Sequence, residues 1–302
     1  MALKDIKNKI KATERTHKVT RAMEAVSAVK MRKTQVAALA GRPYARAALS
    51  ILARLSGSAD TKRHSLAEVR EVRKLALVVI TSDKGLAGAL NSSVLREVEN
   101  ALGARLRDSV VMYAYGRKGE EYLRRREYHI AKAFENKRDE VVISDTEKLA
   151  HDLSEGFARG EYDEVVAVYS NFKSTFEQAP TLRTLLPLSL RSIEQLVNDI
   201  VPARGKYSET EKIESPVAYE VEPSPEEVLN ALLPRLVAVS LYHMLLEAKA
   251  SEHSARMVAM KNASDKSEEI SEDLTRLYNK RRQAAITREV SEIVSGREAV
   301  AV

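Results

Sequence analysis

Cysteine and tryptophan are absent from the 302-residue chain, and aromatic residues make up only 5% of it. Without cysteine the chain has no disulfide, no thiolate nucleophile and no cysteine-ligated metal site. The low aromatic content and the 30% share of charged residues are unusual for a compact enzyme but typical of long, solvated helices. Composition therefore excludes thiol chemistry and favours an extended helical protein, although a hydrophobic share of 44% still supports a core.

Long apolar runs are also lacking. The N-terminal stretch 1–19 is basic, but it has no apolar core like that of a secretory signal. The most apolar segment, 231–246, is interrupted by Pro234, Arg235 and His243. It is also shorter than the roughly 18 apolar residues that a membrane-spanning helix needs. We therefore predict a soluble chain, even if that chain is attached to a membrane complex.

Glycine and proline do not occur before residue 41. Good helix formers dominate this stretch, so we predict one helix over residues 3–55 with a bend at 41–43. Its apolar positions form only a thin seam, and a long helix with so little to bury needs a partner helix. The main seam residues are Ile6, Ile10, Val19, Met23 and Val26.

Positive charge is concentrated near the N-terminus. The whole chain carries a net charge of +6, and residues 1–35 hold ten basic and three acidic side chains. A basic helix can face nucleic acid, anionic lipid or an acidic protein surface, or it can simply be solvated. Single-strand recognition is disfavoured because no aromatic residues are interleaved with the basic ones, whereas duplex binding by charge alone stays open.

A second long helix is predicted at the C-terminal end. Ser224-Pro-Glu-Glu227 places serine at the N-cap, proline at the first helical position and glutamate at the third. Only Pro234 interrupts the pattern before Gly296, which we predict as the stop. About 60 residues would span roughly 90 Å, more than the diameter of a domain, so this helix must project or lie within another protein.

Two sets of apolar residues in this helix are spaced by four and then three positions. The second set begins about ten residues after the first set ends. The two sets are Ile270, Leu274 and Leu277, and Ile286, Val290 and Ile293. The gap between the sets breaks strict register, so we predict an irregular coiled coil. The first and last helices are the expected partners, antiparallel if both leave the same face of the middle domain.

The middle of the chain alternates apolar runs of strand length with helical patterns, which indicates a mainly parallel α/β sheet of Rossmann-like type. The expected fold class is therefore α/β plus a long antiparallel coiled coil that forms a shaft. Expected domains are an N-terminal helix (1–57), an α/β domain (58–223) with a polar insertion near 191–215, and a C-terminal helix (224–302). Predicted strands are 75–80, 110–113 and 164–169, with a candidate at 180–190, and predicted helices are 91–107, 119–126 and 144–159.

Residues 81–88 follow a predicted buried strand and precede a predicted helix, the place where α/β folds hold phosphates. This turn leaves a nucleotide-using enzyme as one interpretation. It contains neither the dinucleotide fingerprint nor a P-loop, so a tight structural turn is favoured. His243 and Glu247 lie one turn apart and could share a metal, but no third ligand has a defined spacing. We expect no catalytic residue, no cofactor and no metal.

Segments along nearly the whole chain resemble, in order, the gamma subunit of F-type ATP synthase of the bacterial type. They are Ile6-Lys-Asn-Lys-Ile10, Thr20-Arg-Ala-Met-Glu-Ala-Val26 and Lys30-Met-Arg-Lys33, then Ser82-Asp-Lys-Gly-Leu-Ala-Gly88 and Phe172-Lys-Ser-Thr-Phe176, and finally 252–263, 278–289 and 292–296. The chain departs from the family at Arg297, which follows Gly296 where alanine is common, at Ala87, which replaces a cysteine of some bacterial relatives, and in the longer segment 191–215.

The resemblance implies a central-stalk rotor subunit that couples rotation of the membrane c-ring to proton-driven ATP synthesis or to ATP hydrolysis. The paired helices would fill the α3β3 hexamer, and the α/β domain would meet the epsilon subunit and the c-ring. ATP chemistry would belong to the β subunits. The expected location is the cytoplasmic face of the bacterial inner membrane. The alternative is a basic coiled-coil scaffold or a nucleic-acid-associated protein.

The resemblance also implies contact residues inside the hexamer. Met23 matches a site that faces an acidic loop of β, and Arg256 and Gln283 match a polar catch against β. Ordinary exposed side chains on a helix remain the competing interpretation. The full set of expected contact residues is Met23, Lys30, Arg32, Lys33, Arg256, Arg282, Gln283 and Thr287.

Overall fold

The computed structural model describes residues 2–40, 47, 64–103, 105–135, 140, 141, 143–189, 222 and 224–300. The predicted bend at 41–43, the end of the first helix and the insertion near 191–215 lie outside these residues. The chain divides into two compact units, described separately here: residues 1–27 with 256–302, and residues 28–255. The domain boundaries expected at 57/58 and 223/224 stay predictions.

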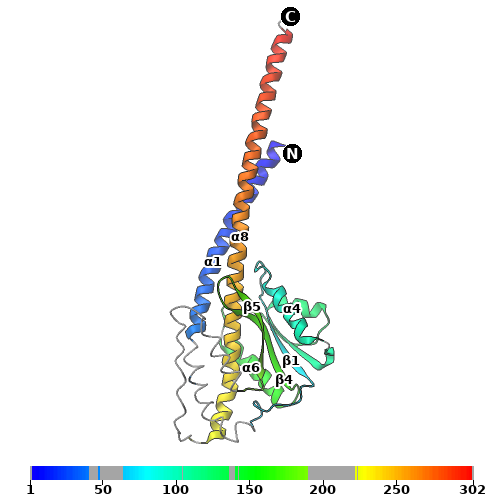
Figure 1. The fold of residues 1–302 in the computed structure, drawn as a ribbon, viewed down its shortest axis with the longest axis vertical. Coiled ribbons are helices and arrows are strands. Elements are labelled where there is room, and N and C mark those ends of the chain that lie inside the picture. Colours follow the sequence, from blue (N-terminus) through cyan, green and yellow to red (C-terminus); the bar gives the residue numbers. More distant parts are fainter. Residues whose placement is uncertain are drawn as a thin grey trace. The chain divides into compact units, whose positions relative to one another are not determined.

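A five-stranded sheet forms the centre of the 28–255 unit (Figure 1). Its strands are β1 (Leu75–Ile80), β2 (Val110–Tyr115), β3 (Ile130–Phe134), β4 (Glu164–Phe172) and β5 (Gln178–Leu186). They lie in the order β3-β2-β1-β4-β5, and only β5 is antiparallel to its neighbour. The predicted strands and the mainly parallel sheet are confirmed. Strand β3 was missed because the middle of this edge strand, Ala-Lys-Ala, is exposed and carries no apolar run.

Helices cover both faces of the sheet, as alternation along β1 shows. Leu77 and Val79 of β1 pack with α4 (Leu90–Leu102) and α5 (Arg117–Arg125). Ala76, Val78 and Ile80 pack instead with α6 (Ile143–Ala158) and the first part of α8 (Pro225–Val300). All six residues of β1 are buried, which explains why the strand reads as an unbroken apolar run.

Helix α8 begins where the sequence predicts, because the Ser224 hydroxyl accepts a hydrogen bond from the Glu227 N–H group at 3.2 Å. The prediction that the helix stops at Gly296 is wrong, since α8 continues to Val300. Glycine inside a helix costs only about 1 kcal/mol relative to alanine, and no proline follows it. The helix also continues through Pro234.

The apolar first part of α8 is a core helix of the α/β unit. Within the described residues α8 is the one helix that is apolar enough over 18 residues to cross a membrane by composition alone, and half of that window is buried in the protein. Leu233, Leu236 and Leu241 are each at most 1% exposed and belong to the core beside β1 and β4. Packing against the sheet therefore explains this apolar composition.

The other unit contains the first part of α1 (Leu3–Ala40) and the last part of α8. Within it the two helices run side by side in opposite directions (Figure 1). His17 of α1 meets Ser264 of α8, with the His17 Nδ1 atom 3.1 Å from the Ser264 carbonyl oxygen. This contact confirms that the two terminal helices form an antiparallel pair.

Candidate partner interface

The contact seam of the helix pair consists mostly of small or hydroxylated side chains. The buried residues of this unit are Ile6, Thr20 and Ser27 on α1, and Arg256, Met260, Ser264 and Ser267 on α8. Two hydroxyls of this seam bond to the backbone of their own helix: Thr20 donates to the Thr16 and His17 carbonyls at 3.0 Å, and Ser267 donates to the Ala263 carbonyl at 2.7 Å. The Ser264 hydroxyl instead meets the His17 Nδ1 atom of α1 at 3.2 Å. The seam therefore buries few polar groups without partners, but it also buries little apolar surface.

The apolar residues that suggested the coiled coil do not form this seam. Ile270 and Leu277 are 41% and 38% exposed, and of the first set only Leu274 is half-buried. The second set is exposed throughout. The register explains the difference: because His17 meets Ser264 in an antiparallel pair, the start of α1 at Leu3 lies opposite about residue 278.

Beyond that point α8 is a single exposed helix within its unit. Every residue from 279 to 295 is exposed except Ala285, which is half-buried. Four aliphatic side chains in this stretch are 51–72% exposed, namely Ile286, Val290, Ile293 and Val294. Apolar side chains gathered in this way on an otherwise polar helix mark a surface that another protein covers.

Three of the expected contact residues lie on this exposed end of α8. Arg282, Gln283 and Thr287 are all exposed, and the Thr287 hydroxyl donates to the Gln283 carbonyl at 3.0 Å. Two others lie in the paired region of the same unit. Met23 is half-buried, and Arg256 is only 7% exposed, so the chain itself already covers that guanidinium.

The basic contact residues of α1 belong to the α/β unit. Lys30 is half-buried, whereas Arg32 and Lys33 are exposed. Lys33 forms an ion pair with Glu140 at 2.5 Å, but both side chains are more than 60% exposed, so this pair contributes little stability. The contacts expected from the resemblance therefore stay predictions. The structure shows only which of these side chains are accessible in the isolated chain.

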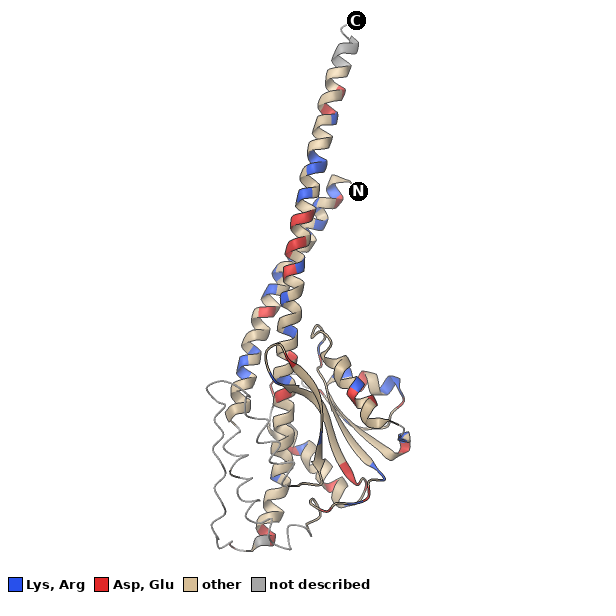
Figure 2. Cartoon of the chain, in the orientation of Figure 1, with Lys and Arg blue, Asp and Glu red and all other residues tan. Residues whose placement is uncertain are grey.

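Charge is unevenly distributed over the helix pair (Figure 2). Basic side chains follow α1, whereas α8 carries an acidic stretch formed by Glu268, Glu269, Glu272 and Asp273. The ion pairs of this stretch stay within α8, as in Lys266–Glu269 at 2.7 Å and Arg276–Glu272 at 3.6 Å. The acidic stretch of α8 is thus opposite in sign to the basic α1, which favours association of the two helices at long range.

The 81–88 turn precedes α4 in the chain, but its side chains fill the N-terminus of the neighbouring helix α5. The Asp83 carboxylate accepts from the Arg117 N–H group at 2.9 Å, and the Thr81 hydroxyl oxygen accepts from the Gly119 N–H group at 2.7 Å. The Lys118 N–H group donates to the Ser82 carbonyl at 3.1 Å. Because these donors of α5 are already used inside the protein, the turn acts as a structural link between β1 and α5.

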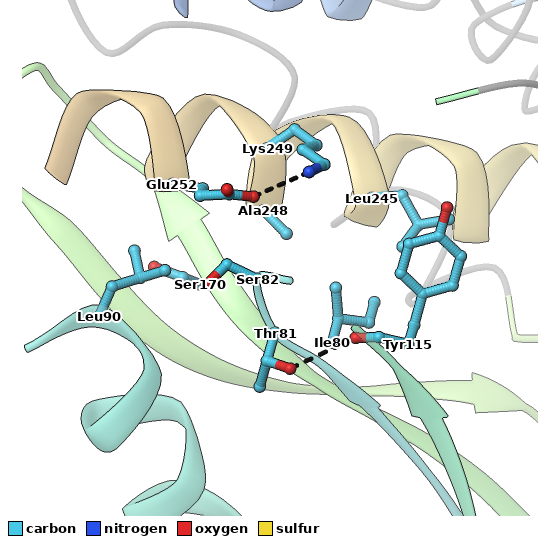
Figure 3. Close-up of a pocket in the computed structure, with 10 residues that line it drawn as sticks. All are labelled: Ile80, Thr81, Ser82, Leu90, Tyr115, Ser170, Leu245, Ala248, Lys249 and Glu252. Carbon is cyan, nitrogen blue, oxygen red and sulfur yellow. Dashed lines mark hydrogen bonds and ion pairs between the residues drawn. The ribbon is translucent and has the colours of Figure 1, made fainter. Parts of the chain in front are cut away.

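A small cavity lies at the carboxyl ends of β1 and β4, where open α/β sheets commonly bind ligands (Figure 3). Lys249 and Glu252 of α8 line it and form a buried ion pair at 2.9 Å. The cavity volume is only about 10 Å³, room for a single water molecule. The cavity is therefore too small for a nucleotide. Within the described residues no group of three or more acidic, histidine or cysteine side chains could hold a metal.

Two serines of α8 attach this helix to the sheet, and sequence reasoning missed both. Ser251 donates its hydroxyl to the Ser170 carbonyl at 2.9 Å, and Ser254 donates to the Thr175 carbonyl at 2.6 Å. Both serines are fully buried. The sequence pattern hides them because serine on a long polar helix reads as a solvated residue, and only the packed structure shows its acceptor.

Comparison with known proteins identifies the family to which this architecture belongs. The family profile described as ATP synthase matches residues 2–300. The ATP synthase gamma chain of Roseiflexus castenholzii is 43% identical over 302 residues, covering 99% of this chain and 98% of that protein. The gamma chain of Moorella thermoacetica is 38% identical over 298 residues and covers 99% of both. A solved central stalk and c-ring of the Tetrahymena thermophila mitochondrial ATP synthase contains a chain that is 29% identical, with a TM-score of 0.61, covering 82% of this chain and 99% of that one.

The paired terminal helices, the small α/β domain and these relatives define a central-stalk rotor subunit of a rotary ATP synthase. The comparisons give no support to the alternative of a basic scaffold or nucleic-acid-associated protein. The chain belongs to the ATP synthase gamma chain family.

Proposed function

We propose that this chain turns inside the α3β3 hexamer and couples rotation of the c-ring to conformational changes at the catalytic sites of the hexamer. The observation that carries the proposal is the exposed end of α8, residues 279–295, on which four aliphatic side chains lack cover. A hexamer bore would bury these side chains. Membership of the gamma chain family supports the same assignment.

Coupling requires that the contact free energy between shaft and ring depend on both the shaft angle and the ring conformation. A pair of helices meets this requirement because its cross-section is not round, so each of three β subunits faces a different surface. In this chain the difference is chemical as well, since α1 is basic and the middle of the paired part of α8 is acidic. Rotation would present these surfaces to each β subunit in turn.

The finer assignments follow from the same proposal. ATP synthesis and hydrolysis occur on the β subunits, and the α/β domain meets the epsilon subunit and the c-ring on the cytoplasmic face of the bacterial inner membrane. Contacts with the hexamer are made by Met23, Lys30, Arg32, Lys33, Arg256, Arg282, Gln283 and Thr287. Among these, the exposed residues Arg282 and Gln283 are accessible without any rearrangement of the chain, whereas Arg256 would have to leave its present cover.

Charge reversal at Lys30, Arg32 and Lys33, each changed to glutamate, tests the proposal in a reconstituted α3β3γ complex. Each charge contact at the protein surface contributes roughly 0.5 kcal/mol, so three of them together predict a fall of up to about tenfold in the rate of ATPase-driven rotation. The measurement is single-molecule torque together with steady-state hydrolysis. Loss of the Lys33–Glu140 pair adds little, because that pair is exposed.

The matched control reverses three exposed basic residues of the α/β domain, Arg96, Arg105 and Lys148, and is expected to leave rotation unchanged. Co-purification of the wild-type chain with a hexameric ATPase is the preceding check. A chain that does not associate with the ring would overturn the proposed function, and equal torque from both triple variants would remove the role of the basic residues.

A further inference from the structure

The buried side of α8 changes from mostly apolar to polar shortly before the helix leaves the α/β unit. Val237 and Met244 on this side are at most 1% exposed and belong to the core. The next residues on the same side are Glu247, Ser251 and Ser254, which follow Met244 at steps of three, four and three. All three are buried, so the last contacts of α8 with the sheet are polar.

The Ser251 hydroxyl reaches a carbonyl of β4 whose neighbour on β5 is a proline. Ser170 of β4 lies opposite Pro180 of β5 in the antiparallel ladder. Because proline has no N–H group, Pro180 cannot donate to the Ser170 carbonyl. Ser251 donates to this carbonyl at 2.9 Å, and both serines are buried. Helix α8 therefore provides β4 with a hydrogen bond that Pro180 is unable to supply.

The Ser254 hydroxyl bonds to the turn between β4 and β5, residues 173–177, and to the residue that follows it. It donates to the Thr175 carbonyl at 2.6 Å and accepts from the Gln178 side-chain amide at 3.3 Å. The same amide donates to the Thr175 carbonyl at 3.1 Å, so helix and turn share one network. Ser254 is fully buried and is the last but one residue of α8 within the α/β unit. These bonds therefore hold α8 at the point where it leaves the domain.

Hydrogen bonds and apolar contacts respond differently to a twist of the helix. Apolar burial is non-directional, whereas a hydrogen bond weakens steeply when its angle falls below roughly 120°. A small rotation of α8 about its own axis would thus cost more at Ser251 and Ser254 than along the apolar part of the same side.

We propose that Ser251 and Ser254 fix α8 against rotation within the α/β domain, and that they thereby carry torque between this domain and the shaft. The inference rests on the proposed function. Helix α8 is continuous from Pro225 to Val300, so a helix fixed at this point transmits a turn of the domain along its whole length. Both serines act through α8, and we class them as positioning residues.

The test measures the twist of the α/β domain in an α3β3γ complex whose ring is fixed to a surface. A cysteine introduced at Leu106, which is 78% exposed, carries a bead, since the chain has no cysteine of its own. In the double variant Ser251→Ala and Ser254→Ala the angular spread of the paused bead should widen by about twofold, because directional bonds no longer hold the helix. The stall torque should fall, and ATP hydrolysis without load should keep its wild-type rate.

Two matched variants separate this role from general stability. Ser154→Ala removes a buried hydroxyl of α6 that has no hydrogen-bond partner within the described residues. Val98→Ala lowers the unfolding temperature by weakening the core on the face of the sheet opposite α8. Neither should widen the angular spread. No widening in the double variant, or equal widening in Val98→Ala, would overturn the inference while leaving the proposed function intact.

The single variant Ser254→Ala keeps the test decisive if the double variant does not assemble. In this variant the Thr175 carbonyl retains its bond from Gln178, so folding is less affected, and a smaller widening in the same direction is expected. An unchanged spread in an assembled Ser254→Ala complex would also overturn the inference. Failure of the wild-type chain to rotate in the hexamer would instead count against the proposed function.

Discussion

Replacement of Gly116 by valine is expected to unfold the α/β domain under conditions in which the wild-type chain is stable. Gly116 lies between β2 and α5 with a φ angle of +102°, and a Cβ atom there would come within 2.1 Å of the Thr81 carbonyl oxygen. The Thr81 backbone therefore occupies the space that a side chain at position 116 would need. The Gly116 N–H group also donates to the Phe134 carbonyl at 2.8 Å, which holds Gly116 in place. The steric conflict and the unfavourable φ together predict a loss of about 4 kcal/mol or more.

Urea unfolding followed by circular dichroism measures this loss. The matched control is Gly85→Ala in the 81–88 turn, where an added Cβ meets nothing within 4 Å, and its effect should stay below about 1 kcal/mol. Similar unfolding midpoints for the two variants would show that the close approach of β1 and the start of α5 does not limit the stability of the domain.

Stability of the contact between α8 and the sheet is expected to fall as the pH rises from about 5 to 7, because of Glu247. This carboxyl is on the buried side of α8, where Tyr169 of β4 and Arg183 of β5 lie near it, and it is only 8% exposed. Burial raises the pKa of Glu247 from its usual 4.5 to about 7, and the nearby Tyr169 hydroxyl and Arg183 guanidinium only partly oppose this rise.

The direction of the pH effect follows from proton binding. Below pH 4.5 the carboxyl is protonated in both the folded and the unfolded chain, so burial carries no ionisation penalty. Between pH 4.5 and about 7 only the folded chain keeps the proton, and stability is lost as the pH rises. A pKa rise of this size corresponds to roughly 3 kcal/mol. Above pH 7 the loss is complete and no longer depends on pH.

Glu247→Gln removes the titrating group while keeping the shape of the side chain. The variant should lose this fall in the free energy of unfolding between pH 5 and 7, which urea titrations at pH 5, 6, 7 and 8 would measure. Glu268→Gln, at an exposed position of α8, is the control and should keep the wild-type profile. A wild-type slope in the Glu247→Gln variant would assign the pH dependence to other groups.

Strong local patterns made much of the fold predictable. The run Leu75–Ile80 was identified as a buried strand because both of its faces are covered, and Ser224 marked the start of α8 because its hydroxyl caps the helix. Strand β3 was not predictable, since an exposed edge strand needs no apolar run. The predicted stop of α8 at Gly296 was wrong because a single glycine can be accommodated inside a helix when helix formers follow it.

The candidate interface was less predictable than the fold. Spacing of three and four pointed to Ile270 and Leu277 as seam residues, whereas the packed seam uses Ser264 and Ser267. Apolar periodicity identifies a surface that will be covered, but it does not say whether the chain itself or another protein covers it. The contact residues expected inside the hexamer come from family resemblance alone and stay predictions, because polar residues on a helix carry no pattern of their own.

By itself, the sequence determined two long helices, a buried α/β sheet and the absence of thiol chemistry, because these depend on composition and on short-range periodicity. Only the tertiary structure decided the strand order, the serine-rich seam and the filling of the α5 N-terminus by Asp83 and Thr81. These features join residues that are far apart along the chain, as His17 and Ser264 are. Their geometry arises only when the whole chain packs, so no local pattern encodes it.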